Sequence, residues 1–311
     1  MPAAAADRNV DMLIGGQAVI EGVMMRSHTG YTVAVRQPGG GISIRKDRLA
    51  SLASRYPIVK IPVVRGSIVL IQSLILGIRA LNYSASVASE GEDGSPEMSS
   101  WAVASSMGMA FVFGIALFVL APLGLTNLIR HTLAPEMGNL LYNVIDGLIR
   151  AGFFFIYIVA ISYLEDIRRV FQYHGAEHKT VYTFEASEEL TVENARKKST
   201  LHPRCGTSFL LFVMAISIVV FSLVPSTAPF AVKFGARILL LPLIAGIGYE
   251  IIRFSARHLA NPICRVLIQP GLWLQKITTR EPDDTQLEVA IVALREALVY
   301  DAVEENAPAV A

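Results

Sequence analysis

Long apolar runs separated by short polar segments occupy much of the second and third quarters of the chain. The hydrocarbon core of a bilayer is about 30 Å thick, so a helix that crosses it needs roughly 20 apolar residues. Four runs reach or approach that length, and they predict four transmembrane helices in a mainly α, polytopic membrane protein. These runs are residues 101–125, 144–164, 208–224 and 234–254.

A fifth apolar run, residues 61–85, has a different pattern. Its polar members Arg65, Gln72 and Arg79 recur every seven positions, which places all three on one narrow face of a helix. Such a helix either crosses the membrane with a polar seam or lies in the interface, dipping in and out of it.

The distribution of lysine and arginine favours the second alternative. Positive charge is concentrated before residue 62, between residues 166 and 207, and after residue 254. The remaining two connections carry mainly Arg130 and Lys233. Cytoplasmic loops are the basic ones, and four spans place all three basic regions, with both termini, in the cytoplasm. A fifth span would separate the N-terminal region from the others, so we expect residues 61–85 to be interfacial or re-entrant.

The segments outside the spans are short. Turn signals HTG and PGGG predict a small cytoplasmic β region within residues 12–60, and the stretch SEGEDGSPEMSS predicts an acidic linker over residues 86–100. A cytoplasmic loop, residues 165–207, interrupts the membrane domain of residues 101–254. A C-terminal cytoplasmic segment, residues 255–300, follows it.

An amphipathic helix is expected in that C-terminal segment. It begins at Asp284 or Thr285, and its apolar residues fall on one stripe, which must cover the cytoplasmic parts or the membrane surface. The stripe consists of Leu287, Ala290, Ile291, Leu294 and Leu298.

Composition supports the membrane assignment. The chain is 53% hydrophobic and only 17% charged, and its mean hydropathy of +0.48 is high for a soluble protein. A net charge of +1 implies no general attraction to nucleic acid. Two cysteines do not make a disulfide framework. The sequence carries no signal for an oligomeric state.

The loop contains the candidate chemistry. His174 and His178 are four residues apart, so a helix that continues from the second span would present both rings on one face. With Glu177 they read H-x-x-E-H, a pattern in which two histidines bind zinc and the glutamate acts as a general base.

Three further residues of the loop could complete the ligand set: His202, Cys205 and Glu185. Three protein ligands with an open position would make a catalytic site, and four would make a closed structural one. Spacing alone does not separate these alternatives, nor does it exclude histidines that only form hydrogen bonds at the interface.

A glycine-rich stretch near the N-terminus, GGQAVIEG, offers Gln17 and Glu21 as polar groups on the same side of the membrane. We expect a strand edge with turn glycines there. In the functional alternative, one of the two polar side chains reaches the metal loop and supports its ligands.

The chain resembles the YqhQ-like family of bacterial membrane proteins. Stretches that carry this resemblance are GGQAVIEGVMMR, YHGAEHKTVYTFE, LTVENARKKSTLHPRCGTSF and EPDDTQLEVAI. These stretches extend from about residue 12 to residue 295. The resemblance implies a membrane location and a metal-dependent enzyme, and it implies no substrate.

Together these features suggest a metal-dependent, hydrolytic enzyme of the cell membrane, with a divalent metal, Zn²⁺, at the cytoplasmic face. Glu177 would be the base, and the helix at residues 61–85 would present a lipid or membrane-protein substrate. The alternative is a non-enzymatic scaffold or assembly factor whose metal only stabilises the loop.

The topology is testable by labelling from outside the cell. A cysteine introduced near Met137 should react with an impermeant thiol reagent, and one near Lys197 should not, because the three basic regions share the cytoplasmic side. The unmodified chain gives the background. Labelling near Lys197 would refute both the four-span topology and a cytoplasmic site.

Overall fold

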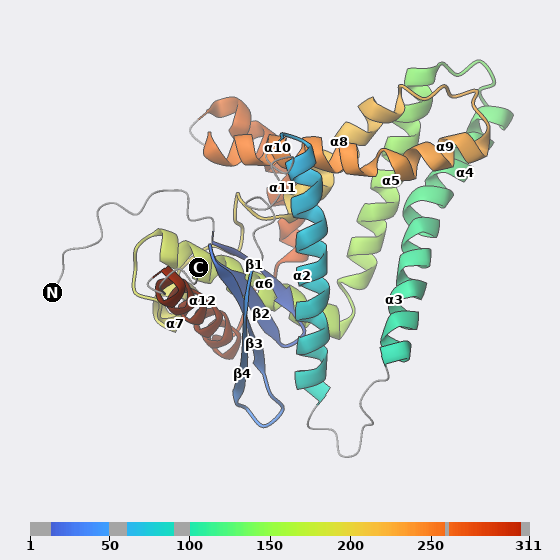
Figure 1. The fold of residues 1–311 in the computed structure, drawn as a ribbon. Coiled ribbons are helices and arrows are strands. Elements are labelled where there is room, and N and C mark those ends of the chain that lie inside the picture. The colour runs from blue at the N-terminus through green and yellow to red at the C-terminus, as the bar shows by residue number, and fades with distance from the viewer. Residues whose placement is uncertain (1–13, 50–60, 90–99, 259–260, 306–311) are drawn as a thin grey trace, which may run out of the picture.

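The computed structural model describes residues 14–49, 61–89, 100–258 and 261–305. It is mainly helical, with one small sheet near the N-terminus (Figure 1). The expected acidic linker lies largely outside the described residues, as do the first 13 residues and the last six.

The elements in chain order are β1 (Gly15–Val19), β2 (Gly22–Arg26), β3 (Gly30–Arg36), β4 (Ile42–Arg48), α2 (Val64–Ser89), α3 (Ser100–Ile115), η2 (Ala116–Leu120), α4 (Ala121–Thr132), α5 (Asn139–Ile161), α6 (Glu165–Glu185), α7 (Val192–Arg196), α8 (Thr207–Phe221), α9 (Phe230–Leu239), α10 (Leu241–Arg257), α11 (Pro262–Thr278) and α12 (Asp284–Glu305).

The expected β region is an antiparallel meander in the order β1-β2-β3-β4. Val19 pairs with Gly22, so a two-residue turn joins β1 to β2, and Glu21 within it has a positive φ of 50°. Successive side chains of a strand point to opposite faces. Val23 and Met25 of β2 therefore enter one apolar cluster, and Met24 between them enters another.

Helices α12 and α6 cover the first face of the sheet. The apolar stripe predicted on the C-terminal helix is buried there: Leu287, Ala290 and Leu294 are at most 1% exposed. They pack with Val23 and Met25 of β2 and with residues of α6. The stripe therefore covers other elements of the same chain, and it makes the sheet and α6 one packed unit.

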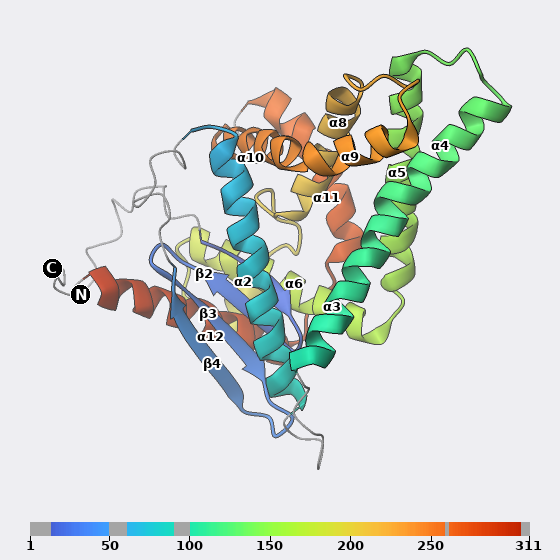
Figure 2. The ribbon, with the colours of Figure 1, turned by 45° about the vertical axis from the view of Figure 1, so that its right-hand side comes forward.

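Helix α2 covers the opposite face of the sheet, as both ribbon views show (Figures 1 and 2). Leu76, Ala80 and Val87 of α2 are buried against Val33 and the neighbouring apolar residues of the sheet. The sheet is thus the middle of three layers, with α2 on one side and α12 with α6 on the other. The C-terminal half of α2 is held by this contact.

The N-terminal half of α2 packs against α10. Gly66 and Gly246 allow the two backbones to approach closely, because a Cβ at Gly246 would lie 2.3 Å from the carbonyl oxygen of Val63. Small residues at a crossing are typical of helices packed in membranes. Arg65 donates two hydrogen bonds to Glu250 of α10, at 2.6 and 3.2 Å. One member of the polar seam therefore has an ionic partner within the chain.

In the part of the chain that the structure describes, three helical segments are long and apolar enough to cross a membrane, and a bent pair could make a fourth span. Two of the three match expected spans. The bent pair, α9 with α10 at an angle of 43°, occupies the fourth expected position as a broken span or re-entrant loop. The three single segments are Val64–Ser89, Ser105–Thr132 and Asn139–Ile161.

The structure differs from the expected set of spans at two places. Helix α8, at the third expected position, has 15 residues and is about 22 Å long, short of the roughly 30 Å needed. Helix α2 qualifies as a span by length and apolarity, although charge bias favoured an interfacial helix. Its outward residues Leu70, Leu74 and Leu81 are 38 to 62% exposed, as suits a face in apolar surroundings.

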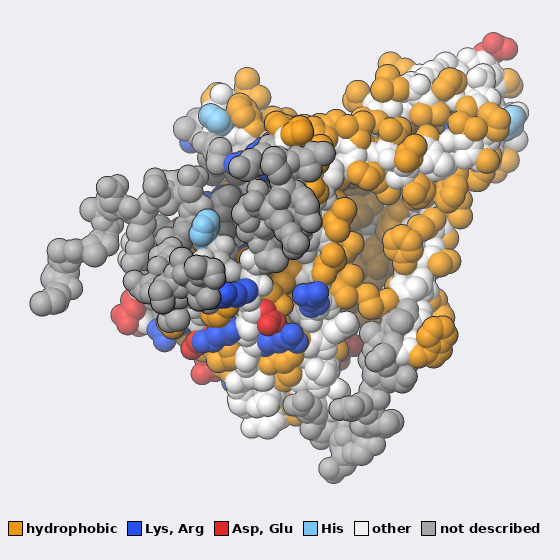
Figure 3. All heavy atoms as spheres, viewed as in Figure 1, with side chains coloured by type: hydrophobic (Ala, Val, Ile, Leu, Met, Phe, Trp, Pro, Cys, Tyr) orange, Lys and Arg blue, Asp and Glu red, His pale blue; other side chains and the backbone are white. Residues whose placement is uncertain are grey.

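Apolar side chains cover the face made by α2 to α5 and α9, and charged side chains gather over the sheet and its neighbours (Figure 3). Such a contiguous apolar surface is unusual for a soluble monomer. The distribution is compatible with a membrane protein whose layered sheet unit lies outside the hydrocarbon.

Helix α6 is not a continuation of the second expected span. The helical run ends at Ile161, and α6 begins at Glu165 after a short break. The expectation of one continuous helix is wrong here, because the acidic pair Glu165 and Asp166 starts a new helix whose N-terminus favours negative charge. The break lets α6 run along the sheet (Figure 2).

Asp301 of α12 ties that helix to the β2–β3 turn. Its carboxylate accepts hydrogen bonds from the Ser27 hydroxyl at 2.7 Å and from the backbone N–H groups of His28 and Thr29 at 3.0 Å. Burial raises the pKa of Asp301, but the hydrogen bonds from Thr29 and Ser27 outweigh it, and the net pKa lies below the usual value.

We expect Asp301→Asn to lower the free energy of unfolding by about 1–3 kcal/mol at neutral pH, because an amide cannot accept all these bonds. The folded pKa is depressed, so this contribution is present above roughly pH 4 and is lost as the pH falls through the folded pKa. Thermal unfolding in detergent checks this. Equal stability of variant and wild type at pH 7 would contradict it.

Candidate metal site

The face of α6 that carries His174 and His178 is buried in the middle of the molecule. His178 is 2% exposed, and the two ring centroids are 4.4 Å apart, as four-residue spacing on one helix face requires. Gly175 lies between them and allows close approach of another segment. A Cβ there would lie 2.1 Å from the carbonyl oxygen of Arg280.

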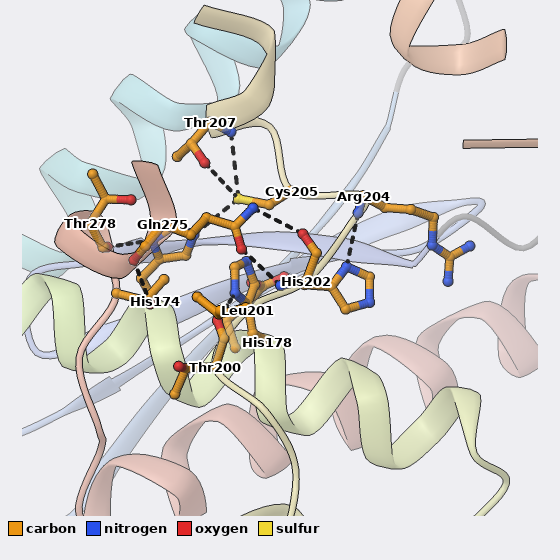
Figure 4. A network of polar contacts seen from close by, with 12 residues as sticks. His174, His178, Thr200, Leu201, His202, Arg204, Cys205, Thr207, Gln275 and Thr278 are labelled. Atoms are coloured by element: carbon orange, nitrogen blue, oxygen red, sulfur yellow. Dashed lines mark hydrogen bonds and ion pairs between the residues drawn. The ribbon is translucent and has the colours of Figure 1, made fainter. Parts of the chain in front are cut away.

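Cys205 joins the histidines from the loop that precedes α8 (Figure 4). Its sulfur lies 3.3 Å from Nε2 of His174. One ligand atom from each of His174, His178 and Cys205 can be chosen so that all three lie within 4.8 Å of one another. In a tetrahedral zinc site, ligand atoms lie roughly 3.5 Å apart. The three residues are therefore close enough to share one ion after small side-chain movements.

Backbone carbonyls fix the orientation of both rings. Nδ1 of His174 lies 2.8 Å from the carbonyl oxygen of Thr278, and Nδ1 of His178 lies 2.5 Å from that of Thr200. A carbonyl only accepts, so each Nδ1 carries a proton, and in the neutral ring Nε2 has a free lone pair. Hydrogen bonds of this kind from the other ring nitrogen are typical of histidines that bind metals.

The surroundings of Nε2 of His178 are those of an atom that could bind a ligand. It is buried and has no hydrogen-bond partner among the described residues. A buried polar nitrogen without a partner is costly, so native structures rarely contain one without a reason. Because its lone pair faces the cluster, a metal ion on Nε2 would satisfy it.

Glu177 flanks the cluster. It is 5% exposed, and its carboxylate lies 3.5 Å from Nε2 of His178. Gly16 of β1 makes room for it, because a Cβ at that position would lie 3.0 Å from Cγ of Glu177. Both residues line a small pocket that the cluster also reaches. A carboxylate beside the ligands, with open space in front, is placed to exchange a proton with a small molecule there.

His202 and Glu185 pair with each other. Nε2 of His202 lies 3.3 Å from Glu185, and its Nδ1 accepts the backbone N–H of Arg204 at 3.3 Å. Burial raises the pKa of Glu185, but His202 and Arg204 outweigh it and lower the net pKa. Both nitrogens of His202 are thus engaged outside the cluster, although its ring is only 5.6 Å from that of His178.

Gln17 and Glu21 point elsewhere. Gln17 faces α2, where its amide lies 3.0 Å from the position of a Cβ on Gly77. Glu21 accepts two hydrogen bonds of 2.5 Å from Arg169 and one of 3.3 Å from Tyr173. Burial, followed by the charge of Glu21, raises the pKa of Tyr173. The N-terminal stretch contributes Gly16 to the pocket, and its polar side chains serve packing and ion pairing.

Gln275 of α11 holds the loop in place and could not be identified from the sequence. Its side-chain amide accepts the backbone N–H of His202 at 2.8 Å and donates to the carbonyl of the same residue at 2.9 Å. Thr207 adds a hydroxyl 3.2 Å from the sulfur of Cys205. The contacts of Gln275 join residues 73 positions apart, and nothing in the local sequence pattern indicates them.

The fold and the cluster define a class: a mainly helical protein with three to four apolar helices that could span a membrane, and a His/Cys cluster beside a small sheet. Residues 61–300 match the family described as "Protein of unknown function (DUF1385)". The chain is 34% identical over 303 residues to "Uncharacterized protein YqhQ" of Bacillus subtilis (strain 168), covering 94% of each chain. This protein therefore belongs to the DUF1385 family. No solved structure matches it.

The geometry predicts which residues retain a metal. Purified protein should contain close to one equivalent of a divalent ion, and His174→Ala, His178→Ala or Cys205→Ser should lower this at least tenfold by removing one of three ligands. His202→Ala is the matched control and should retain the metal. Metal content is measured by mass spectrometry of washed protein. Loss in His202→Ala but not in Cys205→Ser would reverse the ligand assignment.

Proposed function

We propose that this protein is a metal-dependent hydrolase of the membrane, with His174, His178 and Cys205 as the ligands of one Zn²⁺ ion. The observation that carries the proposal is the convergence of these ligand atoms within 4.8 Å. Nitrogen and sulfur donors are the set that zinc prefers, and two His with one Cys leave one position of a tetrahedron free.

An open position favours catalysis over a purely structural ion. The pocket beside the cluster supplies the space for a water molecule and a substrate group. Zinc held at such a site lowers the pKa of a bound water to about 7. Arg204, which is paired with Glu185, also lines the pocket.

Glu177 is the proposed general base. Its carboxylate is buried and lies next to Nε2 of His178, the atom that would bind the ion. It is not among the three residues whose ligand atoms converge. As the base, Glu177 would take a proton from water and return it to a leaving group, and the two histidines and the cysteine would hold the metal.

The proposed substrate is a lipid or a membrane protein. Helix α2 supports this class, because it packs on the sheet that carries the pocket and presents exposed leucines on its outer face. A substrate held against those apolar residues could extend a polar group toward the pocket. In the proposed orientation the sheet, the pocket and both termini are cytoplasmic, because basic segments are typical of that side of the membrane.

A structural metal is the second candidate function. The observation in its favour is the ring of His202, whose centroid is 5.6 Å from that of His178. Rotation of that ring away from Glu185 would supply a fourth ligand and close the site. The protein would then be a scaffold or assembly factor in which zinc stabilises the loop before α8.

Glu177→Gln separates the two functions. It keeps all three ligands, so it should retain the metal, and it removes the base, so the activity should fall by about 10²-fold or more. In a strain that lacks the protein and has a growth defect, this variant should fail to restore growth, as should His174→Ala. Glu193→Gln changes an exposed glutamate and should restore growth fully.

A different pattern would support the scaffold. If Glu177→Gln restores growth at normal protein levels while the ligand variants do not, the metal is structural and the enzymatic proposal is wrong. Metal content of each variant is measured on the same preparations, so that loss of the ion is not mistaken for loss of the base.

A further inference from the structure

Four cationic side chains gather among the apolar helices, on elements that do not contribute to the His/Cys cluster. Arg130 lies on α4, Arg150 on α5, and Lys233 and Arg237 on α9. Lys233 is 4% exposed and Arg237 is 2% exposed. Buried lysine and arginine are rare unless a negative charge accompanies them.

One carboxylate, Asp146, accompanies two of these cations. Its Oδ2 atom lies 2.6 Å from Arg150 and 3.0 Å from Arg237. The contact with Arg237 is an ion pair whose geometry is not that of a hydrogen bond. Among the described residues, Nε and Nη2 of Arg237 are therefore buried without a hydrogen-bond acceptor. Nε of Arg150 and Oδ1 of Asp146 are buried without partners as well.

Among the described residues, Lys233 and Arg130 have only neutral hydrogen-bond acceptors. The ammonium group of Lys233 donates to the side-chain oxygen of Asn127 at 2.5 Å and to the carbonyl of Ser226 at 3.2 Å. Arg130 donates to the same carbonyl. Both cations also lie over the ring of Tyr142, at 4.7 and 6.0 Å from its centroid.

The two pairs form one cluster. Arg237 and Arg150 share the ring of Phe221, at 5.0 and 5.2 Å from its centroid. Arg237 also donates to the backbone carbonyl of Lys233, one helical turn earlier, at 3.1 Å. Aromatic faces and carbonyls at helix ends carry only partial negative charge. They reduce the cost of burying these cations but leave a net positive charge beside unused N–H donors.

We propose that this cluster binds a phosphate oxyanion through Arg237, Lys233 and Arg150. Guanidinium groups bind phosphate through paired N–H donors, and lysine adds a point charge. A phosphate would supply the acceptors that Arg237 lacks and the negative charge that Asp146 alone does not provide. Both sources of this chemistry, a phospholipid headgroup and free phosphate, can be distinguished by experiment.

The surroundings suit a phospholipid. Leu128, Val232 and Leu239 lie on the same helices, α4 and α9, and are 53 to 80% exposed. Acyl chains could cover these side chains while the headgroup enters the cluster. The proposal is independent of the metal, because it uses no residue of α6 or of the loop before α8.

The experiment uses the full chain purified in a non-ionic detergent and depleted of lipid. Native mass spectrometry counts molecules retained after addition of phosphatidylglycerol, of diacylglycerol with the same chains, or of inorganic phosphate. Wild type should retain phosphatidylglycerol and not diacylglycerol. Thermal unfolding of the same samples then separates the two sources. Stabilisation by inorganic phosphate alone would identify the free anion as the ligand, and stabilisation by the phospholipid alone would identify a lipid site.

Variants assign the binding to the cluster. Arg237→Gln and Lys233→Gln should each weaken retention of the phosphate-bearing ligand at least tenfold, and the exposed Arg168→Gln should behave as wild type. Asp146→Asn should strengthen retention several-fold, because it removes the carboxylate that competes with phosphate for the same cations. If Arg237→Gln does not fold, the increased retention by Asp146→Asn tests the proposal in its place.

Two results would overturn the proposal. One is equal retention of phosphatidylglycerol and diacylglycerol with no effect of inorganic phosphate. The other is binding that Lys233→Gln leaves unchanged and Asp146→Asn does not strengthen, since the cations of this cluster would then have no part in it.

Discussion

The close approach of α6 to the chain that follows α11 is the contact on which the site depends. Gly175 permits it, because any side chain there would collide with the carbonyl oxygen of Arg280. The backbone N–H of Arg280 donates to Phe171 of α6 at 2.9 Å and fixes the register. Thr278 then reaches His174, and Gln275 holds the loop that presents Cys205. One glycine thus allows three separate segments to meet.

The sheet connects this site to the apolar helices. Its two faces are buried by helices of different character, α12 with α6 on one side and α2 on the other. Because strand residues alternate between faces, β1 directs Gly16 toward Glu177 and Gln17 toward α2. Helix α2 continues past the sheet to α10, where Arg65 meets Glu250.

Charge is distributed in two separate arrangements. Beside the sheet, two histidines of α6 and a cysteine bring together side chains that could hold a cation. Among α4, α5 and α9, cations outnumber the single carboxylate of Asp146. Each arrangement leaves buried polar atoms without partners, at Nε2 of His178 and at Arg237. Since such atoms are costly, both places are where ligands of opposite charge would stabilise the fold.

The sequence by itself determined what depends on local periodicity. Apolar runs gave the mainly helical class and most candidate spans, turn signals gave the small sheet, and four-residue spacing placed His174 and His178 on one face. The tertiary structure decided what depends on distant partners. Cys205 rather than His202 joins the histidines, because Glu185 and Arg204 hold the His202 ring elsewhere. Helix α2 has the length of a span, and charge counts along the chain could not reveal the sheet packed on one of its faces. Periodicity acts over a few residues, whereas these outcomes depend on the folded chain: His202 meets Glu185 across 17 residues and Gln275 across 73, and His174 meets Thr278 across 104.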